Sequence, residues 1–199
     1  MGQDLILASG SAIRAQMLRN AAVPFRVQPA RVDEEALRQS LDAEGTPPRD
    51  MSDALAEMKA QRVSAKAPGS MVIGCDQILA LGKTVFAKPE SREEAAAQLK
   101  DLRGQQHSLY SAAVICEDGR PVWRHITEVR MRMHRFSDAY LDSYLERNWP
   151  AVATSVGAYQ IESEGVRLFS SITGDYFAIL GLPLTELLSF LALRGLIEQ

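Results

Sequence analysis

The sequence predicts an α/β protein, because strand-like and helix-like segments alternate along its 199 residues. Residues 5–8 form a short apolar run, and a helical pattern with apolar side chains on one face follows directly. Residues 71–81 give the most apolar strand signal and predict a central strand covered on both faces. A chain of this length can bury a core as one large domain or as two modest lobes.

The turn after the first strand is a candidate phosphate cradle. Residues 9–11 (Ser-Gly-Ser) lead into the N-terminus of the first helix, where free N–H groups and the helix dipole favour an anion. The hydroxyls of Ser9 and Ser11 add donors, and the guanidinium of Arg14 fits phosphate oxygens. The alternative is that Ser11 only caps a surface helix and Arg14 faces water.

The remaining elements follow from periodicity and from capping and turn residues. We expect a strand at 23–27, a helix from Asp50 to about Ala65, the strand at 71–81, a hairpin turn at Gly82-Lys83, a helix opened by Ser91 and stopped by Gly104, strands at 107–116 and 121–136, a helix capped by Ser137 and ended by Pro150, a strand at 166–169, a turn at 172–176, and a final apolar helix with Pro183 near its start.

Asp76 is the strongest single candidate for function, because it interrupts the apolar strand at 71–81. A carboxylate is costly there if unpaired, so a metal ion, a basic residue or several N–H donors must meet it. Gly74 lets another backbone or a ligand come close to this strand. Pro89 holds Lys88 extended at the exit of the hairpin, where we expect Lys88 to face the same cleft as Asp76.

Two other segments carry less information by themselves. Residues 32–35 form an acidic cluster, which is either a solvated loop or helix start, or a carboxylate placed to hold a divalent metal or to activate water. Lys59 lies within the helix after Asp50, where a lysine is usually solvated. Residues 82–84 (Gly-Lys-Thr) are not the end of a P-loop, because position 77 is Gln77 and an extended segment follows.

Composition argues against several functional classes. The net charge of -3 disfavours nucleic acid as the main partner. The basic face with Arg130, Arg132 and His134 is more typical of a solvated sheet than of an RNA-binding stripe, because no aromatic residues interleave. Two cysteines fit a reducing cytosol, and no apolar run approaches the ~18–20 residues needed to cross a membrane. We therefore expect a cytoplasmic protein with no nucleic-acid or membrane partner.

Nine segments in this order resemble the Maf family of nucleoside triphosphate pyrophosphatases, nearest its 7-methyl-GTP pyrophosphatase branch. They are Leu7-Ala8-Ser9-Gly10-Ser11 with Arg14; Val32-Asp33-Glu34; Lys59-Ala60; Gly74-Cys75-Asp76-Gln77; Lys88-Pro89; Leu102-Arg103-Gly104 with His107; Thr127-Glu128-Val129; Gly157-Ala158-Tyr159; and Gly174-Asp175-Tyr176 through Gly181-Leu182-Pro183-Leu184.

The resemblance implies a Maf/ITPase-like α/β fold, with a long mixed β-sheet flanked by helices and two lobes with a central cleft, in a single domain over residues 1–199. It implies hydrolysis of a nucleoside triphosphate between the α and β phosphates, which removes non-standard nucleotides and yields a monophosphate and pyrophosphate. It also implies a divalent metal cofactor, Mg2+ or Mn2+, and a homodimer by analogy.

The resemblance also implies roles for individual residues. Arg14, Lys59 and Lys88 would supply positive charge along the triphosphate, with Ser9 and Ser11 in the cradle. The two carboxylates, Glu34 and Asp76, would bind the metal, with Asp76 as the general base or with the two roles exchanged. The catalytic residues expected are thus Asp76, Glu34 and Lys88.

Three positions bear on the base that is recognised. Gln77 and Glu162 resemble the 7-methyl-GTP branch, whereas Ile13 stands where that branch usually carries a tryptophan. A carboxylate at Glu162 can accept hydrogen bonds from the N1–H and N2 amino edge of guanine. We expect 7-methyl-GTP or another guanine nucleotide to be preferred over dTTP and UTP. The alternatives are a dTTP/UTP pyrophosphatase, a nucleotide-binding regulator of cell division with little turnover, and an RNA-binding protein.

Overall fold

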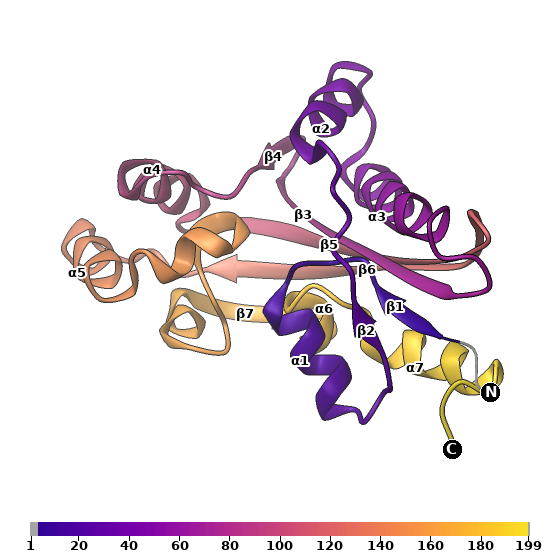
Figure 1. Ribbon diagram of the computed structural model, residues 1–199. Coiled ribbons are helices and arrows are strands. Elements are labelled where there is room, and N and C mark those ends of the chain that lie inside the picture. The colour runs from indigo at the N-terminus through magenta and orange to yellow at the C-terminus, as the bar shows by residue number, and fades with distance from the viewer. Residues whose placement is uncertain (1–3, 199) are drawn as a thin grey trace. The chain divides into compact units, whose positions relative to one another are not determined.

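The computed structural model describes residues 4–198 (Figure 1). Its elements, in chain order, are β1 (Leu5–Leu7), α1 (Ala12–Asn20), β2 (Arg26–Val27), α2 (Glu34–Ala43), α3 (Pro48–Ser64), β3 (Met71–Leu81), β4 (Thr84–Phe86), α4 (Arg92–Leu102), β5 (Gln106–Glu117), β6 (Arg120–Met133), α5 (Asp138–Asn148), the 3-10 turns η1 (Ala151–Thr154), η2 (Val156–Ala158) and η3 (Glu164–Leu168), β7 (Phe169–Thr173), α6 (Tyr176–Ile179) and α7 (Leu184–Leu193).

The strands of the described chain form one mixed sheet in the order β2-β1-β3-β5-β6-β7, with β4 paired to β3. β1 runs parallel to both of its neighbours, so that Leu7 lies opposite Val27 on β2 and Ile73 on β3. β3 and β4 form an antiparallel hairpin in which Leu81 pairs with Thr84. This mixed sheet flanked by helices confirms the expected α/β class, and the hairpin confirms that residues 82–84 are not a P-loop.

Contacts divide the chain into two compact units. The first unit contains residues 1–77, 110–128 and 175–199, and the second contains residues 78–109 and 129–174.

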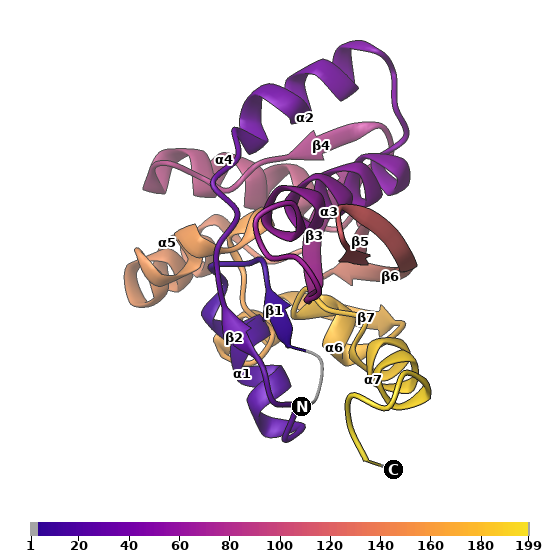
Figure 2. The same ribbon diagram turned by 45° about the vertical axis from the view of Figure 1, so that its right-hand side comes forward.

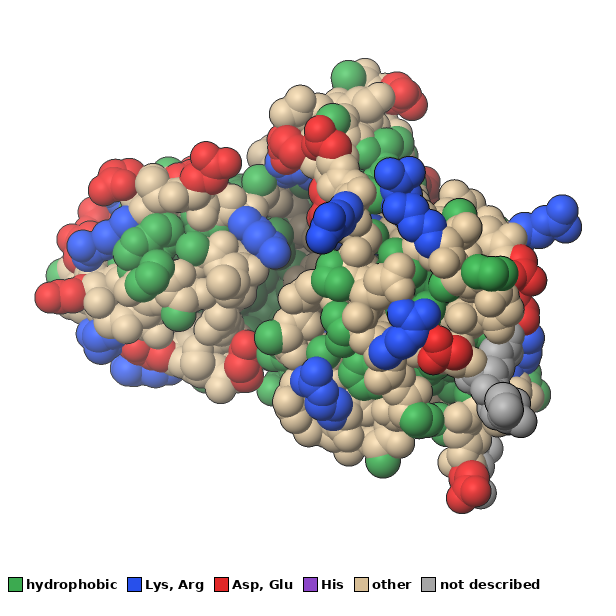
Figure 3. Space-filling view, viewed as in Figure 1, with side chains coloured by type: hydrophobic (Ala, Val, Ile, Leu, Met, Phe, Trp, Pro, Cys, Tyr) green, Lys and Arg blue, Asp and Glu red, His purple; other side chains and the backbone are tan. Residues whose placement is uncertain are grey.

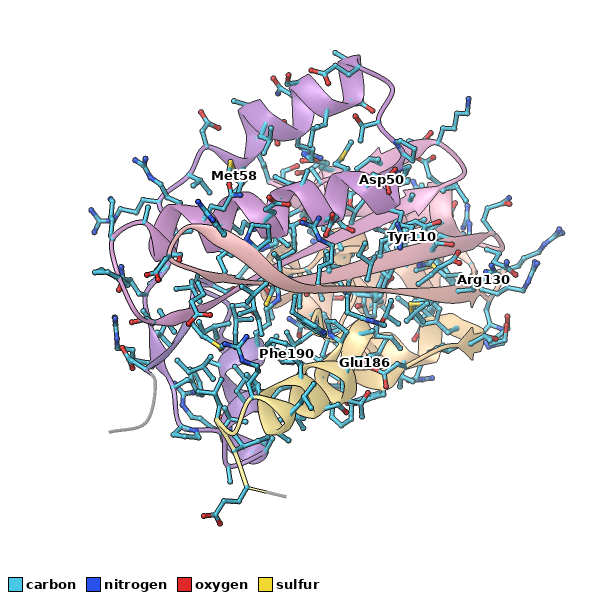
Figure 4. All side chains as sticks on the ribbon, turned by 90° about the vertical axis from the view of Figure 1, so that its right-hand side faces the viewer. Asp50, Met58, Tyr110, Arg130, Glu186 and Phe190 are labelled. Atoms are coloured by element: carbon cyan, nitrogen blue, oxygen red, sulfur yellow. The ribbon has the colours of Figure 1, made fainter. Side chains whose placement is uncertain are left out.

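In the first unit, the side chains of β1 and β3 alternate between two apolar clusters, because successive residues of a strand point to opposite faces. Helices α1 and α7 cover one face and α3 covers the other (Figures 1 and 2). Figure 4 shows this arrangement from the side, with Met58 labelled on α3 and Phe190 labelled on α7. The α7 face contains Leu5, Leu7, Met71, Ile73, Cys75, Ala113 and Leu187, and the α3 face contains Ile6, Ala8, Val63 and Val72.

In the second unit, α4 packs against α5 and η2. The predicted alternation at the end of β6 is confirmed, because Val129, Met131 and Met133 are buried and the arginines between them are exposed. His107 is buried beside Tyr159, whose hydroxyl lies 2.9 Å from its Nε2. No described residue is a partner of the other ring nitrogen, Nδ1. Burial of the ring therefore disfavours the protonated, charged form of His107.

Local capping signals are confirmed at three helices. Ser11, Ser91 and Ser137 precede α1, α4 and α5, and each hydroxyl accepts a hydrogen bond from the backbone N–H three residues later. These side chains satisfy N–H groups that have no partner within the helix. The helix starts were therefore predictable from the serine and the spacing that follows it.

Four expected elements need correction. The helix expected at Asp50 begins at Pro48 after Pro47, since a proline suits the first helical turn, where no N–H partner is needed. The strand expected at 23–27 is limited to two residues. The strand expected at 166–169 and the turn at 172–176 are wrong, because β7 occupies Phe169–Thr173, where it pairs with β6. The short helix α6 was not predicted; Asp175 caps it by accepting from the N–H of Ala178.

On the face drawn in Figure 3, Lys and Arg side chains are interspersed with Asp and Glu side chains. None of the helices within residues 4–198 is both long and apolar enough to span a membrane. Both cysteines, Cys75 and Cys116, are free and buried.

Candidate active site

A buried ammonium group that meets two carboxylates marks the candidate site. Lys59 Nζ on α3 lies 2.7 Å from Asp76 Oδ1 on β3 and 2.8 Å from Glu34 Oε2 at the start of α2. The side chains of Lys59 and Asp76 are only 7% and 10% exposed, whereas Glu34 is 54% exposed. Lys59 is thus not solvated as a helical lysine usually is, and its role in binding the triphosphate stays a prediction. Burial removes the water that would otherwise stabilise the ammonium charge, and the two carboxylates replace that stabilisation.

The packing of α3 on β3 brings this pair together. Gly74 and Asp76 share the face of β3 that α3 covers. A Cβ added to Gly74 would lie 2.1 Å from the carbonyl oxygen of Ala56, so the helix backbone passes very close to the strand. The prediction that Gly74 admits a neighbouring backbone is confirmed. Lys59 lies on this inner side of α3 and reaches Asp76 from there.

The acidic cluster at 32–35 begins a helix. Asp33 is the N-cap residue of α2, and its Oδ1 accepts a hydrogen bond of 3.0 Å from the N–H of Ala36. Glu34, the next residue, turns its carboxylate toward Lys59. The interpretation as a helix start is therefore confirmed at Asp33, whereas a role of Glu34 in holding a metal or activating water stays a prediction.

Burial raises the pKa of the Asp76 carboxyl above its ordinary value, and the charges of Lys59 and Arg14 offset part of this increase. Its Oδ1 accepts the hydrogen bond from Lys59. Its Oδ2 accepts no hydrogen bond from the described residues. This oxygen is not fully enclosed by the protein, so a water molecule or a ligand can reach it. Asp76 therefore has a partner, as a buried carboxylate requires, and retains one oxygen that can take a proton from a bound water.

The turn between β1 and α1 brings Ser9, Ser11 and Arg14 together, as predicted. Ser9 Oγ accepts hydrogen bonds from the N–H of Ser11 at 3.2 Å and from Arg14 Nη1 at 3.3 Å. Ser11 Oγ accepts from the N–H of Arg14 at 3.4 Å and so caps α1. The alternative in which Arg14 simply faces water is wrong, because its guanidinium is half-buried and bonded to the protein.

Arg14 is held by two backbone carbonyls. Its Nε donates to Gly181 O at 2.8 Å, and its Nη1 donates to Cys75 O at 3.2 Å. Cys75 precedes Asp76, so the guanidinium lies against the backbone beside the candidate base. Gly181 has a φ of +97°, and a Cβ there would approach Arg14 Nε and Nη2 to 3.0 Å. The N–H groups on Nη2 donate to no residue within 4–198, which leaves them to bind an anion.

Gln77 has a defined orientation on the opposite face of β3. Its Nε2 lies 2.9 Å from Ser111 Oγ, Ala178 O and Ile179 O. Ser111 Oγ donates in turn to Ala178 O at 2.6 Å, so it accepts from Gln77. The amide nitrogen is thus used by the protein, and the carbonyl oxygen Oε1 is the group that Gln77 can offer a ligand.

Sequence reasoning missed Ser111 and Gly181 as members of this region. Ser111 gave no signal beyond a small polar residue in an apolar strand. Gly181 stood in a segment that was noted as the start of the last helix and as part of the family resemblance, but no role was assigned to it. Both contacts join segments far apart in the chain, so spacing along the sequence does not show them.

Two predicted residues belong to the second unit. Lys88 lies between β4 and α4, and Glu162 lies between η2 and η3; both are exposed. Their proximity to Asp76 stays a prediction. Ile13 belongs to the first unit, where it is half-buried next to Arg14 on α1.

The residues present fit a divalent cation in part. Glu34 and Asp76 converge, since each has an oxygen within 2.8 Å of the same Lys59 Nζ. Within residues 4–198, no group of three or more His, Cys, Asp or Glu side chains could hold a metal ion. Mg2+ typically binds one or two carboxylates and completes its shell with substrate phosphates and water. The donor set fits such an ion in the presence of a phosphate ligand.

The sequence matches known proteins over nearly its whole length. The family described as Maf-like protein matches residues 4–193. A protein of Ruegeria pomeroyi named nucleoside triphosphate pyrophosphatase is 59% identical over 198 residues, which cover 100% of both chains. A protein of the same name from Caulobacter vibrioides is 52% identical and covers 95% of this chain and 94% of its own. A Rhizobium meliloti protein named 7-methyl-GTP pyrophosphatase is 45% identical over 98% of each chain.

Proposed function

The chain belongs to the Maf-like protein family, and from this premise we propose that it hydrolyses a guanine nucleoside triphosphate between the α and β phosphates. It is an enzyme of the nucleoside triphosphate pyrophosphatase class, a hydrolase that acts on an acid anhydride. The single observation that carries the proposal is the ion-pair cluster in which Lys59 joins Glu34 and Asp76, beside the guanidinium of Arg14.

Substrate binding falls to the turn between β1 and α1. A triphosphate carries several negative charges, which need cations and N–H donors along its length. Arg14 Nη2 and the hydroxyl of Ser9 are donors that can meet phosphate oxygens there, and the N-terminus of α1 adds its dipole. Because protein carbonyls already hold Arg14, its fork needs little reorganisation when a phosphate binds. Lys88 is the further cation of this proposal.

Asp76 is the proposed general base. Oδ2 takes a proton from a water molecule, and the resulting oxygen attacks the α-phosphorus in line with the bridging oxygen. The bond from the α-phosphorus to the bridging oxygen breaks, and pyrophosphate leaves with the electron pair of that bond. Lys59 favours the ionised carboxylate that this step requires. Glu34 is the alternative base, since it contacts the same ammonium group.

We include a divalent cation, Mg2+ or Mn2+, in the proposal. Glu34 and Asp76 would hold it together with phosphate oxygens, and it would neutralise charge on the phosphates. The support is that the two carboxylates lie close together, since each has an oxygen within 2.8 Å of Lys59 Nζ. A cytoplasmic location and a homodimer remain proposals that rest on the family.

Guanine is favoured as the base for two reasons. Gln77 offers an acceptor oxygen, and Glu162 is a second acceptor suited to the N1–H and N2 amino group of guanine. The name of the Rhizobium meliloti relative supports 7-methyl-GTP among guanine nucleotides. Ile13 offers an aliphatic surface in place of a stacking ring, so we expect plain and modified guanine nucleotides to be accepted alike. A dTTP or UTP substrate is the alternative.

The test is a nucleotide panel with detection of released pyrophosphate in the presence of Mg2+. We expect 7-methyl-GTP and GTP to have higher kcat/KM than dTTP and UTP. Asp76→Asn should lower kcat by about a thousandfold without unfolding the protein, because an amide cannot accept the proton. The matched control is Asp101→Asn, since Asp101 is exposed on α4 in the second unit. Faster UTP hydrolysis would reverse the ranking, and near-wild-type turnover of Asp76→Asn would refute the base.

A further inference from the structure

We propose that Gly74 is a positioning residue, whose missing side chain lets α3 approach β3 closely enough for Lys59 to hold Asp76. The inference rests on the proposed function, because it concerns the ion pair assigned to that chemistry. It adds a residue that would touch neither substrate nor metal and would act through Lys59.

The contact between Gly74 and α3 is made by backbone atoms. A Cβ on Gly74 would lie 2.1 Å from Ala56 O, 2.6 Å from Ala60 N and 2.9 Å from Ala60 Cβ. A flexible side chain could rotate away from such a clash, but a carbonyl and an amide inside a helix move only with the helix. Separations below 3.0 Å are essentially never seen for a real Cβ, so α3 would have to withdraw by about 0.9 Å at this point.

A shift of α3 away from Gly74 would also move Lys59. Residues 56, 59 and 60 are three or four positions apart or adjacent, so they occupy one side of α3. Ala56 and Ala60 are fully buried against Ala112 and Val114 of β5, which leaves the helix no free space on this side. Withdrawal of α3 therefore moves the Cα atom of Lys59 away from Asp76. The present separation of 2.7 Å between Nζ and Oδ1 would lengthen unless the buried lysine stem finds a new conformation.

The competing explanation is that Gly74 serves packing alone. Both explanations predict a less stable protein when a side chain is added. They differ in catalysis, because only a positioning role makes the effect on kcat depend on Lys59. A double-mutant cycle measures that dependence directly.

The experiment measures kcat, KM and the urea midpoint for the wild type, Gly74→Ala, Lys59→Met and the double variant at pH 6, with activity expressed per folded molecule. We expect Gly74→Ala to lower kcat by about tenfold to a hundredfold, since a 1 Å misplacement of a catalytic group can cost this much. KM should change by less than about threefold, because Arg14 is not displaced. In the Lys59→Met background, Gly74→Ala should change kcat by less than about threefold.

Ala60→Ser is the second variant, in case Gly74→Ala does not fold. It adds one atom at the same contact from the helix side and should lower kcat in the same Lys59-dependent way. The matched control is Ala113→Ser, which enlarges a fully buried residue on the other face of the sheet. It should lower the urea midpoint while its kcat stays at the wild-type value.

Two results would overturn the inference. One is an equal fold-loss of kcat from Gly74→Ala with and without Lys59, and the other is wild-type kcat in both folded contact variants. If the wild type released no pyrophosphate from any nucleotide, the proposed function would fail by itself. The urea midpoints would then still test the contact, because Gly74→Ala should lower the midpoint less in the Lys59→Met background.

Discussion

Replacing Lys59 with Met tests whether the ammonium group is what keeps Asp76 ionised in the folded protein. Met fills a similar volume without charge. The carboxyl of Asp76 would keep its burial but lose the partner 2.7 Å away. We expect the folded variant to bind a proton at Asp76, because an unpaired buried carboxylate is costly.

The structure sets the size of this effect. At an effective dielectric constant near 20, two charges at the observed 2.7 Å attract by about 6 kcal/mol, part of which the desolvation of Lys59 already consumes. Protonation of Asp76 limits the loss in the free energy of unfolding. The ordinary pKa of the carboxyl is 3.8, and each pH unit above it costs about 1.4 kcal/mol for a group kept neutral. Lys59→Met should therefore lower the free energy of unfolding by about 3–4 kcal/mol at pH 7.

The assay is urea unfolding followed by circular dichroism at pH 7 and pH 5. In the variant the folded state holds a proton that the unfolded chain releases, so stability falls as pH rises. The loss should therefore shrink to about 1–2 kcal/mol at pH 5, and adding Asp76→Asn should remove the pH dependence. Arg62→Met, on an exposed position of α3, is the control and should cost less than about 0.5 kcal/mol. A loss below about 1 kcal/mol at pH 7, or one independent of pH, would refute this account.

Three other predictions follow from the same contacts. Arg14→Lys should raise KM about tenfold or more with a smaller change in kcat, since a compact ammonium lacks the planar fork whose separate nitrogens bond the two carbonyls and leave Nη2 for a phosphate; an unchanged KM would contradict this role. Glu34→Gln should raise the Mg2+ concentration for half-maximal rate about tenfold, measured by metal titration of pyrophosphate release, with little effect on unfolding because Glu34 is half-exposed. Burial lowers the pKa of His107 to about 4 from 6.5, so as pH falls the unfolded chain takes up this proton before the folded protein does. The free energy of unfolding should therefore fall by about 3 kcal/mol between pH 6.5 and pH 4. Urea unfolding of His107→Phe should show a weaker dependence of stability on pH, and an unchanged dependence would exclude this histidine as the cause.

Sequence alone determined the features that depend on neighbours a few residues away. The caps Ser11, Ser91 and Ser137, the hairpin turn at 82–83 and the bounds of β3 all followed from short-range spacing and turn chemistry. Asp76 was also identifiable, because a carboxylate within an apolar strand requires a partner whatever the fold. The family followed from nine short segments in one order, although no single segment is specific.

Only the tertiary structure decided which partner Asp76 has. By its spacing Lys59 was an ordinary helical lysine, and the family resemblance assigned it to the triphosphate and not to Asp76. Its burial depends on α3 lying against β3 at Gly74. The placement of β7 and the two carbonyls that hold Arg14 likewise depend on segments far apart in the chain. Such contacts form when distant apolar faces pack together, so their geometry is a property of the assembled core and is absent from any local pattern.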